Sequence, residues 1–303
     1  MALRITGVTL LNNALSLGYP FRESLRSLLR VADDVVVNVG QGEDGTWEAV
    51  RDLGSDRIKP FRSAWDLRPR AGEALSEQVN LALARCDGDW VMYLQADEVL
   101  HESDVDPLRR RMEAHASDDV EGLVFDYLHF YGSPHLVNDD WIAFYPRAVR
   151  AVKRRAGLIA FGDAAGFAHV SAGRRRGLIK AHSGARIFHY GWADPGKLAR
   201  AAALSALYHE RGVGNLENLF PDDLQSQPHL RLFEGTHPEP MRERILQAPR
   251  PPAPRSHRTP ASFRAWRSFL LSPRARLQAA RAFLPLWLTN LKWRRAARTD
   301  REV

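Results

Sequence analysis

Short apolar strand patterns alternate with helix patterns through the first part of the chain, and this alternation restricts it to few folds. The predicted strands are residues 5–11, 35–39, 56–61 and 90–94, and the predicted helices between them are 21–31, 47–53 and 75–85. Strands separated by helices at this spacing pair in parallel, because the crossover connections cover the faces of the sheet. We therefore expect an α/β protein with a doubly wound, mostly parallel sheet.

The last of these strands ends in two adjacent carboxylates. Residues 90–94 are apolar or aromatic, and Gln95 and Ala96 then lead to Asp97 and Glu98, with no basic residue beside them. Open α/β sheets bind ligands at the carboxyl ends of their strands. Carboxylates held there suit a hard divalent cation that also contacts phosphates. The alternative is a strand that ends in a solvated acidic turn.

A smaller, mixed β/α part follows residue 104. Its predicted elements are a helix at 108–116, strands at 122–127, 142–145 and 187–190, and a helix from about 195 to 211. Residues 249–260 contain five prolines and indicate an extended linker. We therefore expect one domain over 1–215 with halves at 1–104 and 105–215, an extension at 216–248, and a tail at 249–303.

The charge of the chain is concentrated in that tail. Residues 250–303 carry 13 Arg or Lys and 2 acidic residues, whereas the rest of the chain carries 30 basic and 34 acidic residues. Arginines interleaved with large apolar groups are typical of helices that lie on anionic membranes, and the alternative is a helical tail packed on the body. No nucleic-acid partner is expected, because the body is acidic and carries no recognised module. The single cysteine, Cys86, fits a cytoplasmic protein, peripheral on the inner face of the membrane if the tail binds there.

Several motifs occur in an order that points to one family. They are Asn12-Asn13, Gly18-Tyr19-Pro20, Glu43-Asp44-Gly45-Thr46, a helix with Ser76, Gln78 and Asn80, Gln95-Ala96-Asp97-Glu98, and His189-Tyr190-Gly191-Trp192. Over residues 4–215 the chain resembles the family 2 glycosyltransferases, most of all bacterial members whose corresponding strand ends in Gln-Ala-Asp-Glu. The resemblance implies a GT-A fold, with a nucleotide-sugar-binding half at 1–104 and an acceptor half at 105–215. It also implies an inverting, hexosyltransferase-type enzyme.

The resemblance implies a metal site as well. Asp97 would hold Mn²⁺ or Mg²⁺, and His189 would complete the coordination from the far side. The family pattern here is Asp-x-Asp, and Gln95 stands in place of the first acid, so it brings no charge to the cation. A histidine packed in the core is the alternative interpretation of His189.

Nucleotide contacts are expected along the ends of the early strands. Asn12 and Asp44 would contact the base or ribose, Gln95 a ribose hydroxyl, and Arg68 and Arg70 the diphosphate. Asn80 belongs to the same predicted group by its place in the family motif. Residues 43–46 can alternatively cap the following helix, and the arginine pair can simply be solvated.

Inversion requires one general base, and the sequence offers several acids after residue 104. Asp163 is the first candidate, because the glycines near it let the backbone approach a sugar closely. Asp140 is the second, and Asp126 and Asp139 are further candidates. Each of these acids can alternatively cap a turn. His129, Tyr131 and Trp141 are the predicted acceptor face, with core packing as the alternative.

These expectations combine into one function. The chain would transfer a sugar from a nucleotide-sugar donor, with UDP-sugars the first choice, to a glycan or lipid-linked acceptor of a bacterial cell envelope. A divalent metal would stabilise the diphosphate leaving group. The alternatives are a non-catalytic GT-A-like protein that binds glycan or nucleotide, which the Gln95 departure makes worth considering, and a nucleotidyltransferase.

Overall fold

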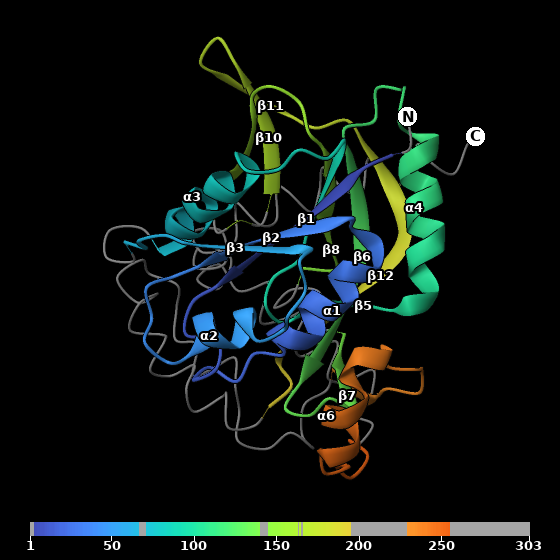
Figure 1. Ribbon diagram of the computed structural model, residues 1–303. Helices are drawn as coiled ribbons and strands as arrows, with labels where there is room; N and C mark the ends of the chain where they lie inside the picture. Colours follow the sequence, from blue (N-terminus) through green and yellow to red (C-terminus); the bar gives the residue numbers. More distant parts are fainter. Residues whose placement is uncertain are drawn as a thin grey trace, which may run out of the picture.

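A ten-stranded mixed sheet forms the body of the protein (Figure 1). The computed structural model describes residues 3–66, 71–139, 145–162, 164, 166–194 and 229–254. The elements of the first half are β1 (Ile5–Leu11), α1 (Phe21–Val31), β2 (Asp34–Val39), α2 (Thr46–Arg51), β3 (Ile58–Arg62), α3 (Ala71–Leu83) and β4 (Trp90–Tyr93). Those that follow in the same sheet or pack on it are β5 (Glu98–Leu100), α4 (Val105–Ala114), β6 (Gly122–Tyr131), β7 (Leu136–Asn138), β8 (Arg147–Lys153), β12 (Lys180–Trp192), β13 (Leu230–Leu232) and α6 (Arg242–Gln247).

The order of the strands joins a parallel half to a half in which most pairs are antiparallel, although β12 and β6 pair in parallel. The main path runs β13-β7-β6-β8-β4-β1-β2-β3, and β12 pairs with β5 and β6. The pairs among β3, β2, β1 and β4 are parallel, whereas β4–β8, β8–β6 and β6–β7 are antiparallel. The predicted α/β sheet is therefore confirmed, with the mixed part beginning where β8 joins β4.

Alternating side chains on the central strands build a core on both faces of the sheet. Every residue of β1, β2 and β4 is buried. Val35 and Val37 pack with α1, while Val36 packs with Val79 of α3 on the opposite face. A Cβ at Gly7 of β1 would lie only 2.7 Å from Leu28 Cγ, so this glycine allows α1 to approach the sheet closely.

The second half differs in detail from the predicted elements. The predicted strand at 142–145 lies outside the described residues except for Tyr145, which is not in a strand, and the next strand is β8. The predicted helix at about 195–211 also lies outside them. Three short strands after β8 form a separate antiparallel sheet that was not predicted: β9 (Leu158–Phe161), β10 (Gly166–Ser171) and β11 (Arg174–Gly177).

Residues 229–254, part of the predicted extension and linker, pack against the body. β13 pairs with β7, and α6 lies beside β7 in Figure 1. Arg244 forms an ion pair with Glu23 of α1 at 2.8 Å, and Arg30 of α1 pairs with Glu239. The segment is therefore fastened to helix α1, although more than two hundred residues separate the partners in sequence.

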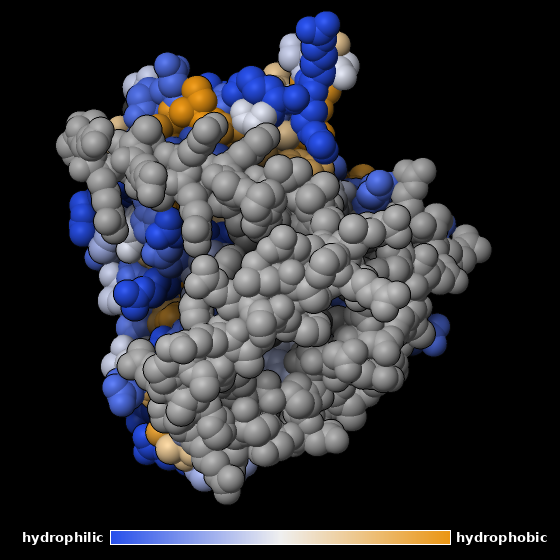
Figure 2. Space-filling view, turned by 180° about the vertical axis from the view of Figure 1, so that it is seen from behind, coloured by the Kyte–Doolittle hydropathy of each residue, from blue (hydrophilic) through white to orange (hydrophobic). Residues whose placement is uncertain are grey.

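The visible described surface is mostly hydrophilic. Seen from behind, the parts that are not grey are mainly blue, with orange in small areas (Figure 2). Large apolar side chains exposed on the described part of the chain are Leu81, Val170, Ile179 and Leu246. In the part of the chain that the structure describes, no helix has the length and apolar character required to cross a membrane.

The small sheet is attached to the body through a buried glutamate. Glu121, 2% exposed, accepts two hydrogen bonds of 2.7 Å from the guanidinium of Arg176 and one of 3.0 Å from the Ile179 backbone N–H. The hydrogen bonds from Arg176, opposed by burial, lower the pKa of the Glu121 carboxyl from 4.5 to about 2. A carboxyl with a lowered pKa in the folded state contributes stability at neutral pH.

That contribution should be lost in acid. We expect the free energy of unfolding to fall as the pH is lowered from about 4.5 to about 2, the window between the two pKa values of Glu121. Glu121→Gln should lack this part of the decrease, which urea unfolding at a series of pH values will measure. Glu77→Gln, at an exposed position of α3, is the control. Parallel pH profiles of the wild type and Glu121→Gln would contradict the assignment.

Candidate functional site

Asp97 lies in the tight turn between β4 and β5. The Gln95 carbonyl accepts a hydrogen bond from the Glu98 N–H and another from the Ser24 hydroxyl of α1. The Asp97 carbonyl accepts from the Tyr190 N–H of β12 at 2.8 Å. The turn is therefore held from both sides by backbone contacts. The Asp97 side chain itself is 14% exposed.

Glu98 points into the core, where it binds Arg150 of β8. Its two carboxylate oxygens accept from the Arg150 guanidinium at 2.7 and 2.8 Å, and the residues are 0% and 1% exposed. The Tyr127 hydroxyl donates to the same carboxylate at 2.8 Å, and the Gln95 N–H donates at 3.0 Å. The carboxylate thus joins the acidic turn to two strands of the antiparallel half.

This pairing corrects the interpretation of Asp97 and Glu98 as two acids without a basic neighbour. Arg150 neutralises Glu98, although it lies 52 positions further along the chain. The prediction treated the two carboxylates as a pair at the edge of the sheet. Glu98 instead begins strand β5 and is completely buried, so Asp97 is the acid of this turn that faces the site.

His189 lies across from Asp97. It occupies the position of β12 that pairs with Glu98, and its Nε2 is 3.6 Å from Asp97 Oδ2. A Cβ built at Gly191 would lie 2.4 Å from that oxygen and 2.8 Å from that nitrogen. Because real Cβ atoms do not come so close to other atoms, only glycine at 191 leaves the space between the two side chains open. Asp97 and His189, predicted separately, are brought together here.

A second histidine lies behind the first. His129 of β6 is directly opposite His189 in the parallel ladder, and the two Nδ1 atoms are 2.9 Å apart. The other ring nitrogen of His129 is 2.7 Å from the Tyr145 carbonyl oxygen. Burial, followed by the neighbouring His189, lowers the pKa of His129 to about 3.

Two of the predicted acceptor residues are buried, as in the core-packing alternative. His129 and Tyr131, both in β6, are only 3% and 1% exposed. His129 supports His189 and Tyr131 packs with Leu136 and Leu230. The third member, Trp141, lies outside the described residues.

Two loops at the ends of β1 and β2 are fastened to each other. Asp44 accepts from the Ser16 N–H at 2.9 Å and from the Thr46 N–H at 3.0 Å. Burial raises the pKa of the Asp44 carboxyl, but these hydrogen bonds outweigh it, and the net shift is downward. Asp44 thus binds the N–H of the first residue of α2, whose N-cap residue is Gly45, and its nucleotide contact stays a prediction.

Asn12 packs in the same region. A Cβ at Gly40, just after β2, would lie 2.4 Å from Asn12 Oδ1, so this glycine allows the amide to approach the second loop. Since β1 lies between β2 and β4 in the sheet, Asn12, Asp44 and the turn with Gln95 and Asp97 follow three neighbouring parallel strands. They share the sheet edge where ligands bind in such folds.

Asn80, whose nucleotide contact stays a prediction, is hydrogen-bonded to the backbone of β9. Its side-chain nitrogen donates to the Ala160 carbonyl at 3.1 Å, and its oxygen accepts from the Ala160 N–H at 2.8 Å. The amide thereby fastens α3 to β9.

The other acids considered as general bases form ion pairs or lie outside the described residues. Asp126 pairs with Arg147 at 2.6 Å, and Asp139 pairs with Arg231 at 2.6 Å. Four predicted site residues lie outside the described part of the chain: the general-base candidates Asp140 and Asp163, and the predicted diphosphate contacts Arg68 and Arg70. Their predicted roles stay predictions.

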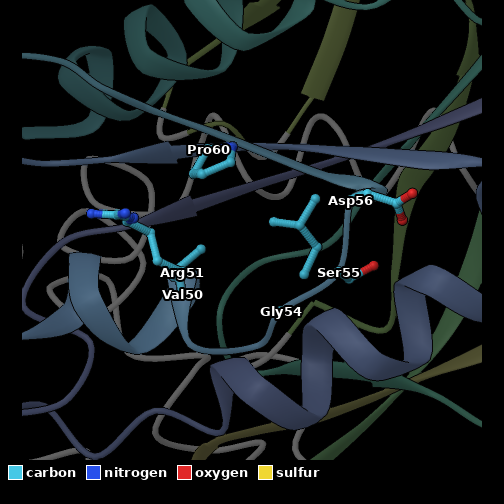
Figure 3. A pocket seen from close by; sticks show the side chains of 7 residues that line it. Val50, Arg51, Gly54, Ser55, Asp56 and Pro60 are labelled. Atoms are coloured by element: carbon cyan, nitrogen blue, oxygen red, sulfur yellow. The ribbon is translucent and has the colours of Figure 1, made fainter.

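A pocket elsewhere on the molecule does not belong to this site. It has a volume of about 290 Å³ and lies between the end of α2 and the beginning of β3 (Figure 3). Its lining residues are Val50, Arg51, Gly54, Ser55, Asp56, Ile58 and Pro60. Asp56 and Ile58 lie at the amino end of β3, so the pocket is at the opposite edge of the parallel strands from Asp97.

The donors at the candidate site fit a cation that is shared with a phosphate ligand. One carboxylate oxygen and one imidazole nitrogen face the space kept clear by Gly191. No group of three or more metal-ligating side chains occurs among the described residues. Mg²⁺ commonly uses one or two carboxylates and completes its coordination with water and substrate phosphates, and Asp97 is the carboxylate that can serve such a cation here.

The sequence alone did not predict the roles of the residues that support Asp97 and His189. Arg150, Tyr127 and Gly191 act through contacts across strands, whose pairing the sequence does not specify. One signal was available for Arg150, since it lies among Val149, Ala151 and Val152 in a strand of buried residues. A buried arginine requires an acid partner.

The family model described as glycosyl transferase family 2 matches residues 20–180. No curated protein matches the chain. Two similar solved structures are Staphylococcus aureus TarS 1-349 in complex with UDP-GlcNAc and the mannosyltransferase PcManGT from Pyrobaculum calidifontis in complex with GDP-Man and Mn²⁺.

The likeness to these two structures is distant. The TarS match has 17% identity and a TM-score of 0.32 over 42% of this chain and 34% of that chain. The PcManGT match has 20% identity and a TM-score of 0.34 over 51% of this chain and 45% of that chain. The chain therefore spans less than half the length of either protein.

The buried pair provides a test of what supports the turn. Arg150→Met should lower the free energy of unfolding by about 3–5 kcal/mol, because it leaves the charge of the buried Glu98 carboxylate without an opposite charge. Arg147→Met, on the same strand, is the matched control. Its pair with Asp126 is exposed, so its loss should cost at most about 1 kcal/mol. Urea unfolding of both variants will measure the difference, and equal costs would contradict this assignment.

Proposed function

Because this chain belongs to glycosyl transferase family 2, we propose that it transfers a sugar from a nucleotide-sugar donor to a glycan or lipid-linked acceptor, with inversion. A UDP-sugar is the first donor to consider, and Mn²⁺ or Mg²⁺ is the proposed cofactor. The family match covers residues 20–180, which include Asp44 and Asp97.

One observation supports this proposal above the others. Asp97 Oδ2 and His189 Nε2 face each other at 3.6 Å across a space that only a glycine leaves open. Packing alone does not require a carboxylate, an imidazole and a glycine to lie together at the carboxyl edge of a parallel sheet. The arrangement is consistent with binding a diphosphate through a shared cation.

Each residue then has a defined task. Asp97 and His189 would hold the cation, which when bound stabilises negative charge on the departing diphosphate. Asn12 and Asp44 would orient the nucleotide from the neighbouring loops, and Gln95 would contact the ribose. The ion pair of Glu98 with Arg150 keeps the turn in place.

The acceptor side needs a general base. Inversion requires one carboxylate to take the proton from the attacking hydroxyl. We propose Asp163, with Asp140 as second choice. We further propose that Arg68 and Arg70 contact the diphosphate and that Trp141 contributes to the acceptor face.

A second candidate function follows from Gln95. It provides an amide where the family pattern has an acid, so the cation site lacks one negative charge. A GT-A-like protein that binds nucleotide or glycan without catalysis is therefore the alternative. The basic tail, if it binds the inner face of the membrane, would bring either kind of protein to a lipid-linked partner.

Loss of the carboxylate charge should remove metal-dependent binding. Asp97→Asn should weaken the binding of UDP in the presence of Mn²⁺ by about tenfold or more, corresponding to at least about 1.4 kcal/mol, because an amide brings no charge to the cation. Titration calorimetry with and without Mn²⁺ will measure this. Undiminished Mn²⁺-dependent binding by the variant would contradict the role of Asp97.

Filling the space beside the pair should have a similar effect without breaking the fold. Gly191→Ala places a methyl group against Asp97 Oδ2 and His189 Nε2, and we expect Mn²⁺ binding to weaken. Gly177→Ala is the matched control, since a Cβ at that β-strand position meets nothing within 4 Å. Equal Mn²⁺ affinity in the two variants would count against the site.

Donor breakdown separates the enzyme from the non-catalytic alternative. Many transferases hydrolyse their donor slowly when the acceptor is missing, so incubation of the full chain with UDP-, GDP- and dTDP-sugars should release one nucleoside diphosphate. Asp97→Asn should abolish that release. Tight nucleotide-sugar binding without any release, with or without candidate acceptors, would favour the binding protein.

A further inference from the structure

We propose that His129 is a positioning residue which, together with the Tyr145 carbonyl, fixes the tautomer of His189 so that its Nε2 lone pair faces Asp97. The inference deepens the proposed function and rests on it only where it concerns the cation. It assigns a role to a buried group for which the sequence alone predicts a place on the acceptor face.

The hydrogen-bond partners of His129 determine where its own proton lies. A backbone carbonyl oxygen can only accept a hydrogen bond. The Tyr145 oxygen is 2.7 Å from His129 Nε2, so Nε2 carries the hydrogen. A neutral imidazole has one N–H and one lone pair, and Nδ1 of His129 is therefore the acceptor.

His129 is in its neutral form at neutral pH. It is 3% exposed, and the ring of His189 lies against it with its centroid 5.0 Å away. A buried ring with this little contact to solvent is costly to charge, and these surroundings therefore favour the neutral form.

The same reasoning then fixes the proton of His189. Its Nδ1 is 2.9 Å from Nδ1 of His129, which accepts, so His189 must donate from Nδ1. In the neutral ring Nε2 then holds the lone pair. The 3.6 Å between Nε2 and Asp97 Oδ2 is longer than an N–H···O hydrogen bond, as expected for two acceptors that face the same space.

This arrangement prepares His189 for a cation. A metal ligand must present an unprotonated nitrogen, and the hydrogen bond at the other ring nitrogen selects which one is free. The chain from Tyr145 through His129 to His189 makes that selection before a cation arrives. Asp97 adds the negative charge on the far side of the same space.

The tautomer can be observed directly in the metal-free protein. Long-range ¹H–¹⁵N spectra of the full chain, labelled at histidine, distinguish Nδ1–H from Nε2–H rings, and the His189→Gln variant identifies the His189 signals. We expect His189 to carry its hydrogen on Nδ1. A hydrogen on Nε2 of His189 would overturn the inference, whatever the metal affinity.

Two substitutions of His129 separate hydrogen bonding from packing. His129→Asn keeps an oxygen that can accept from His189 Nδ1, and it should preserve the tautomer and the Mn²⁺ affinity to within about threefold, far less than the loss typical of a deleted ligand partner. His129→Leu removes the acceptor and should mix the tautomers and weaken Mn²⁺ binding by about 10–100-fold. His169→Asn, at a buried histidine of β10, is the control and should change neither.

The outcomes distinguish this inference from the proposed function. An Nδ1–H His189 in a protein that does not bind Mn²⁺ supports the role of His129 and contradicts the metal-dependent function. Mn²⁺ binding by a protein with Nε2–H His189 does the reverse. If His129→Leu does not fold, the spectra of the wild type and of His129→Asn decide, because loss of the Nδ1–H form in the asparagine variant overturns the role of the acceptor.

Discussion

The ion pair between Glu98 and Arg150 is the interaction on which the candidate site depends. A charge with no exposure is costly unless it is paired and hydrogen-bonded, and here both conditions are met by two guanidinium contacts, one tyrosine hydroxyl and one backbone N–H. The pair joins the parallel half of the sheet, which ends in the acidic turn, to the antiparallel half. It thereby fixes where Asp97 lies relative to His189, which comes from the other half.

Two neighbouring carboxylates thus have opposite environments. Glu98 is enclosed by partners, and Asp97, one position earlier, lies beside a space that Gly191 keeps clear. Asp97 lies in the turn itself, whereas Glu98 is the first residue of β5 and its carboxylate is directed into the core against Arg150. His129 and His189 face each other from paired strands of the other half, and both residues are buried, at 3% and 7% exposed.

The sequence predicted the parallel half well and the mixed half less well. β1 and α1 begin and end where expected, because a buried parallel strand and an amphipathic helix each have a local pattern. β5, β8 and the small sheet were missed, since short strands such as Glu98–Leu100 depend on partners distant in sequence. For the site, the pairing of Asp97 with His189 came from the family resemblance. The role of His129 could not come from the sequence, because it depends on the register between β6 and β12.

Glu98 and Arg150 are far apart in the sequence, and this separation affects the order in which the protein folds during synthesis. The ribosome releases Glu98 well before Arg150, and β12 later still. The Glu98 carboxylate therefore has no guanidinium to pair with until β8, which carries Arg150, has emerged. Helix α1 receives its contacts from Glu239 and Arg244 even later. Topologies dominated by such distant contacts fold slowly. During synthesis the parallel strands should therefore pair first, and Asp97 and His189 should come together only near the end.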